Sequence, residues 1–271
     1  MTPPLPQYEV FAIKYAERDA QRRDNFLFGD PHDGPMAMDY YVWAIKGAVR
    51  SFVLDCGFTA EMAAIRKRRH LRCPVDALRL VGIDPDRVED VIISHLHYDH
   101  AGNLTRFPKA RFHLQEAELQ FCCGRHMRNE VMAHAYECED VVDMVRLNFG
   151  GRVEFHDGVA ELAPGLSIHG VGGHSPGMQF VRVHTARGWV VLASDTSHYY
   201  DNIRLGRPFP GLVDVGKVFD GYEALRVAAD SFDHIVPGHD PLVMRRYPAP
   251  RPDLENIVVR LDVAPVAVDP A

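Results

Sequence analysis

The chain has 271 residues, of which 46% are hydrophobic and 25% are charged, as in an ordinary soluble globular protein. Its net charge of -7 argues against nucleic acid as a partner, because a phosphate-binding surface needs an excess of basic residues. No apolar run is long enough to cross a membrane and residues 1–7 lack a signal-peptide pattern, so we expect a cytoplasmic protein. The five cysteines form no CxxC pair, which is typical of reduced thiols.

Strand and helix patterns alternate along the first third of the chain. Alternating or continuous apolar residues indicate strands, apolar residues at helical spacing indicate helices, and glycine with proline indicates loops. The expected elements are a strand at 8–15, a long loop at 16–38, a hairpin of strands at 40–45 and 50–54, helices at 59–69 and 75–81, and a buried strand at 88–93. This last strand leads the chain directly to His95.

The remainder of the chain continues in the same style. The expected elements are a strand at 111–114, a helix at 115–122, a helix at 139–148 that ends at Gly150-Gly151, strands at 152–155, 166–171, 179–184 and 189–193, a helix through Phe219, Tyr222, Leu225, Ala229 and Phe232, and a strand at 235–236. Interleaved strands and helices predict an α/β protein. Because no repeat, low-complexity tract or linker divides the sequence, we expect one domain over residues 1–271.

Potential metal ligands are concentrated just after the buried strand at 88–93. His95, His97, Asp99 and His100 lie within the segment SHLHYDHAGN. These four side chains cannot share one face of a helix or strand, but a loop that turns into a helix can direct them into one pocket. Imidazole and carboxylate are the ligand types that zinc accepts in catalytic sites. The segment therefore predicts a metal site, with His95 and His97 on one ion and Asp99 and His100 on another.

Three later residues lie where a strand ends or a turn begins. His174 is part of GGHSPG, Asp195 follows the apolar strand VVLA, and His239 is part of PGHD after the last predicted strand. Each of these residues alone is a weak signal, since a single histidine is usually structural. Four separate segments that each present a metal-type ligand indicate one shared site.

The order HxHxDH, GGHSPG, strand-end aspartate and PGH resembles the metallo-β-lactamase superfamily, over about residues 40–239. The resemblance implies a four-layer αβ/βα sandwich with the site at the edge between two sheets. It also implies one metal on His95, His97 and His174, a second on Asp99, His100 and His239, and Asp195 bridging both.

Within that superfamily the chain is most similar to the N-acyl homoserine lactonases. The LDCGF stretch at 54–58, the HLHYDHAGN segment and the SDTSHYY stretch carry this similarity. It implies that a hydroxide bridging two metal ions opens a lactone ring, since bound cations bring the pKa of water down to about 7. Asp99 would then carry a proton to the leaving oxygen.

The sequence departs from the lactonase pattern at one position. The family places a tyrosine three residues after the bridging aspartate, and this chain has His198 there, followed by Tyr199 and Tyr200. His198 and Tyr199 are therefore both candidates for the group that donates a hydrogen bond to the substrate carbonyl. The alternative that the substrate is not a lactone stays open.

Other members of the superfamily provide the competing interpretations. A thioester hydrolase like glyoxalase II shares the ligands, but the stretch from Asp195 to His239 leaves no room for its added helical domain. A metal-binding or redox module is the non-enzyme alternative, and His97 stands where flavin-linked diiron relatives have glutamate. The ligand types favour two Zn²⁺ ions, with Mn²⁺, Co²⁺ or Fe²⁺ as alternatives. The expected partner is a small ester or lactone, and a homodimer is left open.

Overall fold

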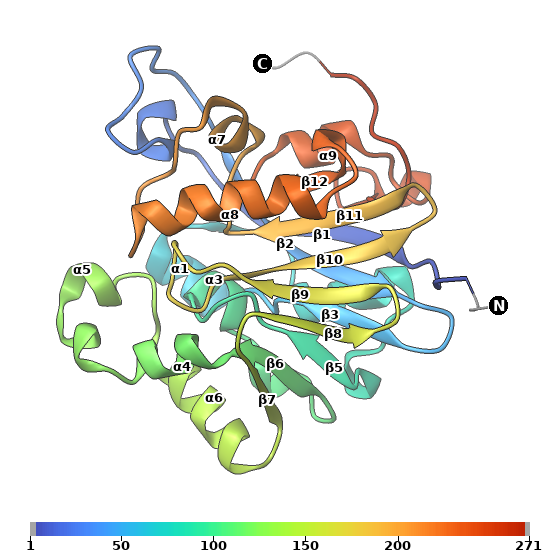
Figure 1. The fold of residues 1–271 in the computed structure, drawn as a ribbon, viewed down its shortest axis with the longest axis horizontal. Coiled ribbons are helices and arrows are strands. Elements are labelled where there is room, and N and C mark those ends of the chain that lie inside the picture. The colour runs from blue at the N-terminus through green and yellow to red at the C-terminus, as the bar shows by residue number, and fades with distance from the viewer. Residues whose placement is uncertain (1–3, 269–271) are drawn as a thin grey trace.

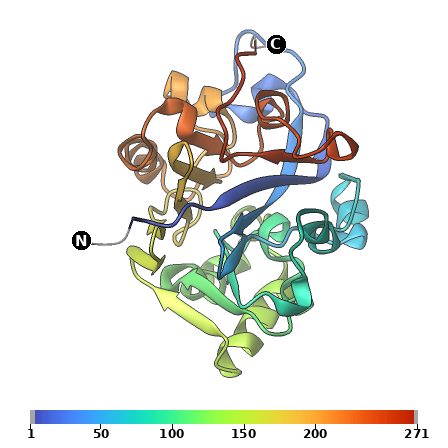
Figure 2. The ribbon, with the colours of Figure 1, turned by 90° about the vertical axis from the view of Figure 1, so that its right-hand side faces the viewer.

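Two β-sheets pack face to face in the computed structural model, which describes residues 4–268 (Figure 1). The expected single domain includes residues 1–3 and 269–271, which lie outside the described residues. The strands of the first sheet run in the order β13-β1-β2-β3-β5-β6-β7, with β4 paired to β1, and those of the second in the order β12-β11-β10-β9-β8. Figure 2 shows the blue strand β1 between the red C-terminal segments and the green middle of the chain.

The strands of the first sheet are β1 (Glu9–Arg18), β2 (Met38–Lys46), β3 (Ser51–Leu54), β4 (Arg69–His70), β5 (Asp90–Ile92), β6 (Arg111–Gln115), β7 (Val153–His156) and β13 (Val258–Arg260). Those of the second sheet are β8 (Val159–Ala163), β9 (Leu166–Gly170), β10 (Gln179–Thr185), β11 (Gly188–Ser194) and β12 (Ile235–Pro237). Parallel pairing joins β3 to β5, β5 to β6 and β11 to β12, so several strands end at the same edge of the sandwich.

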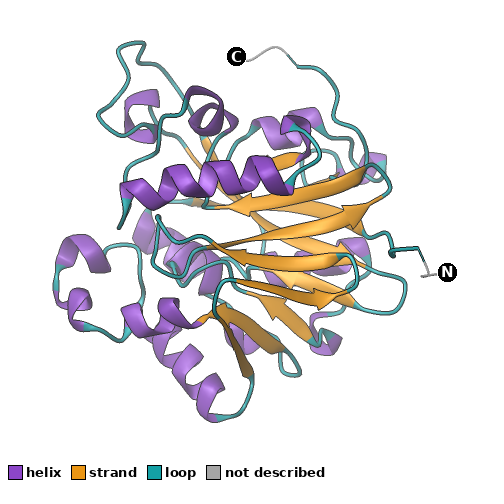
Figure 3. Ribbon diagram, viewed as in Figure 1, coloured by secondary structure: helices purple, strands orange, loops and turns teal. Residues whose placement is uncertain are grey.

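Helices cover the outer faces of both sheets (Figure 3). They are α1 (Ala60–Arg66), α2 (Pro74–Ala77), α3 (Tyr98–Ala101), α4 (Glu116–Cys122), α5 (Glu130–Ala133), α6 (Cys138–Phe149), α7 (Tyr200–Leu205), α8 (Val215–Ala228) and α9 (Leu242–Arg246). Within residues 4–268, none of these helices has the length and apolar character needed to cross a membrane.

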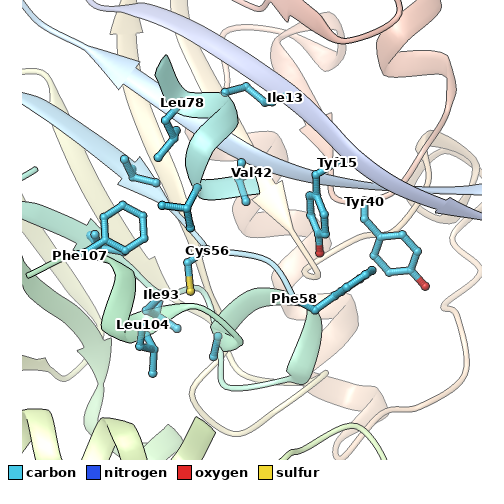
Figure 4. Close-up of a cluster of buried hydrophobic side chains, with 14 of the residues drawn as sticks. Ile13, Tyr15, Tyr40, Val42, Cys56, Phe58, Leu78, Ile93, Leu104 and Phe107 are labelled. Carbon is cyan, nitrogen blue, oxygen red and sulfur yellow. The ribbon is translucent and has the colours of Figure 1, made fainter. Parts of the chain in front are cut away.

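Three buried apolar clusters hold four layers together. The middle cluster lies between the sheets and joins side chains such as Trp43 of β2 to Val181 of β10. A second cluster packs the other face of the first sheet against helices, and Figure 4 shows part of it around Tyr15, Phe58 and Phe107. The third packs α8 on the second sheet. Each sheet thus buries one face on the other sheet and one face on helices, which confirms the expected αβ/βα sandwich.

Several predicted boundaries were wrong for local reasons. The helix expected at 59–69 ends at Arg66, because Lys67 takes a left-handed conformation with φ of 55°. Strand β1 continues to Arg18, so the expected loop at 16–38 is shorter. The helix α8 ends at Ala228, and of its expected apolar face Tyr222 and Leu225 are buried.

The other positions of that predicted face are not buried against the sheet as expected. Phe219 is 44% exposed, and Phe232 is 37% exposed in a separate 3-10 turn. Val218 and Gly221 face the sheet instead. The sequence also does not predict the short strands β4, β8 and β13 or the helices α5, α7 and α9, because their few residues carry too weak a period.

Candidate metal centre

The expected ligands come together at one edge of the sandwich, where strands end. His95 and His97 lie between β5 and α3, and Asp99 and His100 are on the single turn of α3. Asp195 directly follows β11. The remaining two are His174, in the loop between β9 and β10, and His239, two residues after β12. None of the seven residues is more than 9% exposed.

One half of the centre, here called the triad half, consists of His95, His97 and His174. The His97 Nδ1 atom lies 2.9 Å from the Nε2 atom of His95 and 2.9 Å from the Nε2 atom of His174. These three nitrogen atoms therefore converge on one point. That arrangement matches the ligand set expected for the first metal.

The other half, here called the α3 half, consists of Asp99, His100 and His239. The Asp99 Oδ2 atom is 3.7 Å from the His100 Nε2 atom and 3.8 Å from the His239 Nε2 atom. These ligand atoms also lie close enough together for one cation. The second expected ligand set is thus assembled as well.

Asp195 lies between the two halves and presents one oxygen to each. Its Oδ2 atom is 3.9 Å from His95 Nε2 and 3.4 Å from His174 Nε2. Its Oδ1 atom is 3.5 Å from His100 Nε2 and 3.0 Å from His239 Nε2. A carboxylate in this position is placed to bridge two cations.

The residues present fit a pair of divalent cations. Burial lowers the pKa of His95 and His97 well below the usual range, so these imidazoles are neutral and offer lone pairs. In addition, the buried atoms His100 Nε2 and Asp195 Oδ1 make no hydrogen bond within residues 4–268. Buried polar atoms normally have partners, and a cation would satisfy these atoms together. Nitrogen and carboxylate donors suit zinc and its first-row neighbours.

Charges in the α3 half are balanced by protons. Burial alone would lower the pKa of His100, but the carboxylates of Asp195, Asp55 and Asp99 outweigh it and raise that pKa well above the usual range. The pKa of His239 is also raised, because Asp195 outweighs the effect of burial. Burial would raise the pKa of Asp195, yet the neighbouring imidazoles, His239 foremost, hold it well below its usual range. Cation binding would release the imidazole protons, so metal affinity should rise with pH.

Hydrogen bonds behind the ligands orient several of the rings. Asp55 Oδ2 accepts from His100 Nδ1 at 2.8 Å, and the Asp39 carbonyl accepts from His239 Nδ1 at 2.8 Å. Asp55 belongs to the LDCGF stretch, and its role behind His100 was not predicted from the sequence. Its position directly after β3, like that of Asp195 after β11, is the signal that points to this edge.

The two candidate oxyanion donors occupy different surroundings. His198 Nε2 lies 2.9 Å from Asp195 Oδ2, and the His198 ring stacks on Phe209 with centroids 3.4 Å apart. Burial lowers the pKa of His198 to about 3, so this ring is neutral. The Tyr199 hydroxyl instead donates to the Ala37 carbonyl at 3.2 Å. The structure thus brings His198 to the ligands, and it engages Tyr199 elsewhere. Phe209 was not found from the sequence.

Comparison with known proteins gives one family. A family model described as the metallo-beta-lactamase superfamily matches residues 38–239. An N-acyl homoserine lactonase of Bacillus thuringiensis is 31% identical over 185 residues, which is 67% of this chain and 67% of that protein. The N-acyl homoserine lactonase AttM of Agrobacterium fabrum is 28% identical over 178 residues, 62% of this chain and 64% of that protein.

Solved structures give the same fold. One is an N-acyl homoserine lactone hydrolase with the product N-hexanoyl-L-homoserine at its catalytic metal center, with a TM-score of 0.72, 20% identity and coverage of 89% of this chain and 96% of that chain. Another is AidC, a dizinc quorum-quenching lactonase, with a TM-score of 0.66, 15% identity and coverage of 88% and 90%. At these identities the likeness establishes the fold alone.

Proposed function

This chain belongs to the metallo-β-lactamase superfamily, and from that premise we propose that it is a dinuclear metal-dependent hydrolase that opens a lactone ring. The observation that carries the proposal is the pair of three-ligand groups that share Asp195. The similarity to N-acyl homoserine lactonases supports N-acyl homoserine lactones as the substrate class.

The metals and the side chains have separate tasks in this proposal. When bound, two divalent cations lower the pKa of water from roughly 15.7 to about 7 and polarise an ester carbonyl. Asp99 is the most exposed of the seven ligands, at 9%, so its carboxyl is placed to take up a proton and pass it to the leaving oxygen of the opened ring.

His198 is the group we propose as donor to the carbonyl oxygen. Its ring is neutral, so one nitrogen carries a hydrogen and the other does not. In the described chain that ring contacts Asp195 Oδ2. A cation on this oxygen would compete for its lone pair and leave the His198 N–H for a substrate oxygen. Tyr199 is the less supported donor, because its hydroxyl is held by Ala37.

Metal content and a substrate panel test the proposal. Gently purified protein should contain two divalent cations per chain, and the loaded protein should hydrolyse lactones faster than thioesters or aryl esters of matched acyl length. A content at or below one after reloading with excess Zn²⁺ would contradict the dinuclear centre. Preference for thioesters would favour a glyoxalase II-like activity, and visible absorption that changes with reductant would favour a redox module.

A further inference from the structure

A fully buried glutamate lies behind the triad half of the metal centre. Glu118 is on the first turn of α4, and its exposed fraction is 0%. No lysine or arginine pairs with it in the described part of the chain. A buried carboxylate without a cationic partner is costly unless hydrogen bonds compensate for the lost water.

Four N–H and O–H donors from other segments provide that compensation, in addition to the Cys122 thiol of the same helix at 4.0 Å from Oε1. The Oε1 atom of Glu118 accepts from the Leu96 backbone N–H at 3.0 Å and from the Tyr136 hydroxyl at 3.3 Å. The Oε2 atom accepts from the Ser175 hydroxyl at 2.6 Å and from the Gly177 backbone N–H at 2.9 Å. Hydrogen bonds to a charged acceptor are the stronger kind, so Glu118 ties these three segments of the chain to one point.

The tied segments are the ones that carry the triad. Leu96 separates His95 from His97, and Ser175 directly follows His174. Tyr136, in turn, packs its ring edge-on against the His97 ring, with centroids 4.4 Å apart. Among the described residues, Glu118 makes no hydrogen bond or ion pair with Asp99, His100 or His239.

Two of the triad rings lack the usual second anchor. A metal-binding imidazole normally donates its other N–H to a carboxylate or carbonyl. His174 Nδ1 is buried without any partner, and His97 Nε2 makes no hydrogen bond to the described residues. The orientation of these two rings therefore depends on their backbone and on ring packing. Glu118 holds the backbone beside both rings and, through Tyr136, the ring that packs on His97.

We propose that Glu118 is a positioning residue for the triad cation alone. This role rests on the dinuclear centre proposed above, and it means that different groups support the two cations. Glu118→Gln would keep the shape of the side chain but present an NH₂ group to one of the two donor pairs. That change should weaken the triad cation by roughly ten- to a hundredfold, as for other groups behind metal ligands, and leave the α3 cation unchanged.

Titration of the metal-free chain with Co²⁺, followed by visible absorption, tests the proposal without any substrate. Wild type and the matched control Glu116→Gln, an exposed glutamate on the same helix, should bind two equivalents with unchanged affinities. Glu118→Gln should keep one tight equivalent and show one weakened equivalent. Its spectrum with one Co²⁺ should match that of His97→Ala, which damages the triad half, and differ from that of His239→Ala.

Three outcomes would overturn the proposal: two unchanged affinities in Glu118→Gln, an equal loss of both, or a spectrum like that of His239→Ala. An equal loss is what a merely structural role would give. If Glu118→Gln does not fold, Ser175→Ala and Tyr136→Phe each remove one donor, and each should weaken the same single cation to a smaller degree; no effect in either would overturn the proposal. Two bound cations without lactone hydrolysis would contradict the proposed function and leave the assignment of Glu118 intact.

Discussion

The two halves of the metal centre hold their imidazoles in different ways. In the α3 half, both rings are fixed directly, His100 by the Asp55 carboxylate and His239 by the Asp39 carbonyl. In the triad half, only His95 has such a contact, with the Ser94 hydroxyl at 3.0 Å. His97 and His174 are instead held through the loops on which they lie.

The difference follows from where the ligands lie in the fold. His239 follows β12, and its Nδ1 bonds to the neighbouring strand β2, so the sheets themselves provide its anchor. His174 lies on the loop between β9 and β10, and its Nδ1 atom makes no hydrogen bond to the described residues. The buried carboxylate of Glu118 on α4 instead holds this loop, by accepting hydrogen bonds from Ser175 and Gly177. The imidazoles of the α3 half are thus anchored through their own ring nitrogens, and His97 and His174 are held mainly through their loops.

The largest effect is expected where the halves meet. Asp195→Ala removes the oxygen atoms that face both halves, so both cations should bind more weakly and lactone turnover should fall by roughly a thousandfold or more, the value of several kcal/mol of transition-state stabilisation. Elemental analysis together with steady-state kinetics measures both effects. Full activity in this variant would show that the two halves work without a shared carboxylate.

A smaller effect is expected from His198, which contacts the Asp195 oxygen on the triad side. His198→Ala should lower lactone turnover by roughly two to three orders of magnitude, the loss expected for one oxyanion donor, with metal content unchanged. His198→Tyr should recover part of the rate. Tyr199→Phe is the matched control, and a loss confined to that variant would transfer the donor role to Tyr199.

Asp55 tests the α3 half separately, because its carboxylate bonds to His100. Asp55→Asn should weaken the α3 cation by roughly ten- to a hundredfold, because the amide cannot accept from all the donors that now share the carboxylate. The φ of 62° at this position is one that asparagine also adopts, so the backbone should be preserved. Co²⁺ titration should show the reverse of the Glu118→Gln result, with the α3 cation weakened and the triad cation unchanged. Weakening of the triad cation instead would contradict the division into two halves.

The side chains that come together at this edge were predicted from the sequence as candidate ligands, because several of them directly follow an apolar strand. An apolar strand followed by histidine or aspartate identifies His95, Asp195 and His239 without any knowledge of the fold. Glu118 was not predictable, because its four partners come from three distant segments and the sequence around it reads as an ordinary helix. Short elements such as β13 were missed for a related reason: pairing with β1 stabilises them, and three residues carry no period.

The smallest effect is expected outside both halves, at Asp140 on the first turn of α6. Burial, together with the nearby carboxylates of Glu137 and Asp143, raises the pKa of Asp140 to about 7, from 3.8. The folded chain therefore binds more protons than the unfolded chain between those values, so this group costs stability as the pH rises toward 7. Asp140→Asn should remove that cost.

We expect the free energy of unfolding of Asp140→Asn to exceed that of wild type by on the order of 1 kcal/mol more at pH 8 than at pH 5, after allowance for solvent screening and the favourable helix N-terminus. Denaturant unfolding of the metal-free chain at the two pH values measures this difference, and the exposed neighbour Glu139 provides the control Glu139→Gln. Both Co²⁺ affinities should stay unchanged, because Asp140 contacts neither half of the centre. A change in one affinity alone would mean that α6, which packs beside α4, transmits strain to the triad through Glu118.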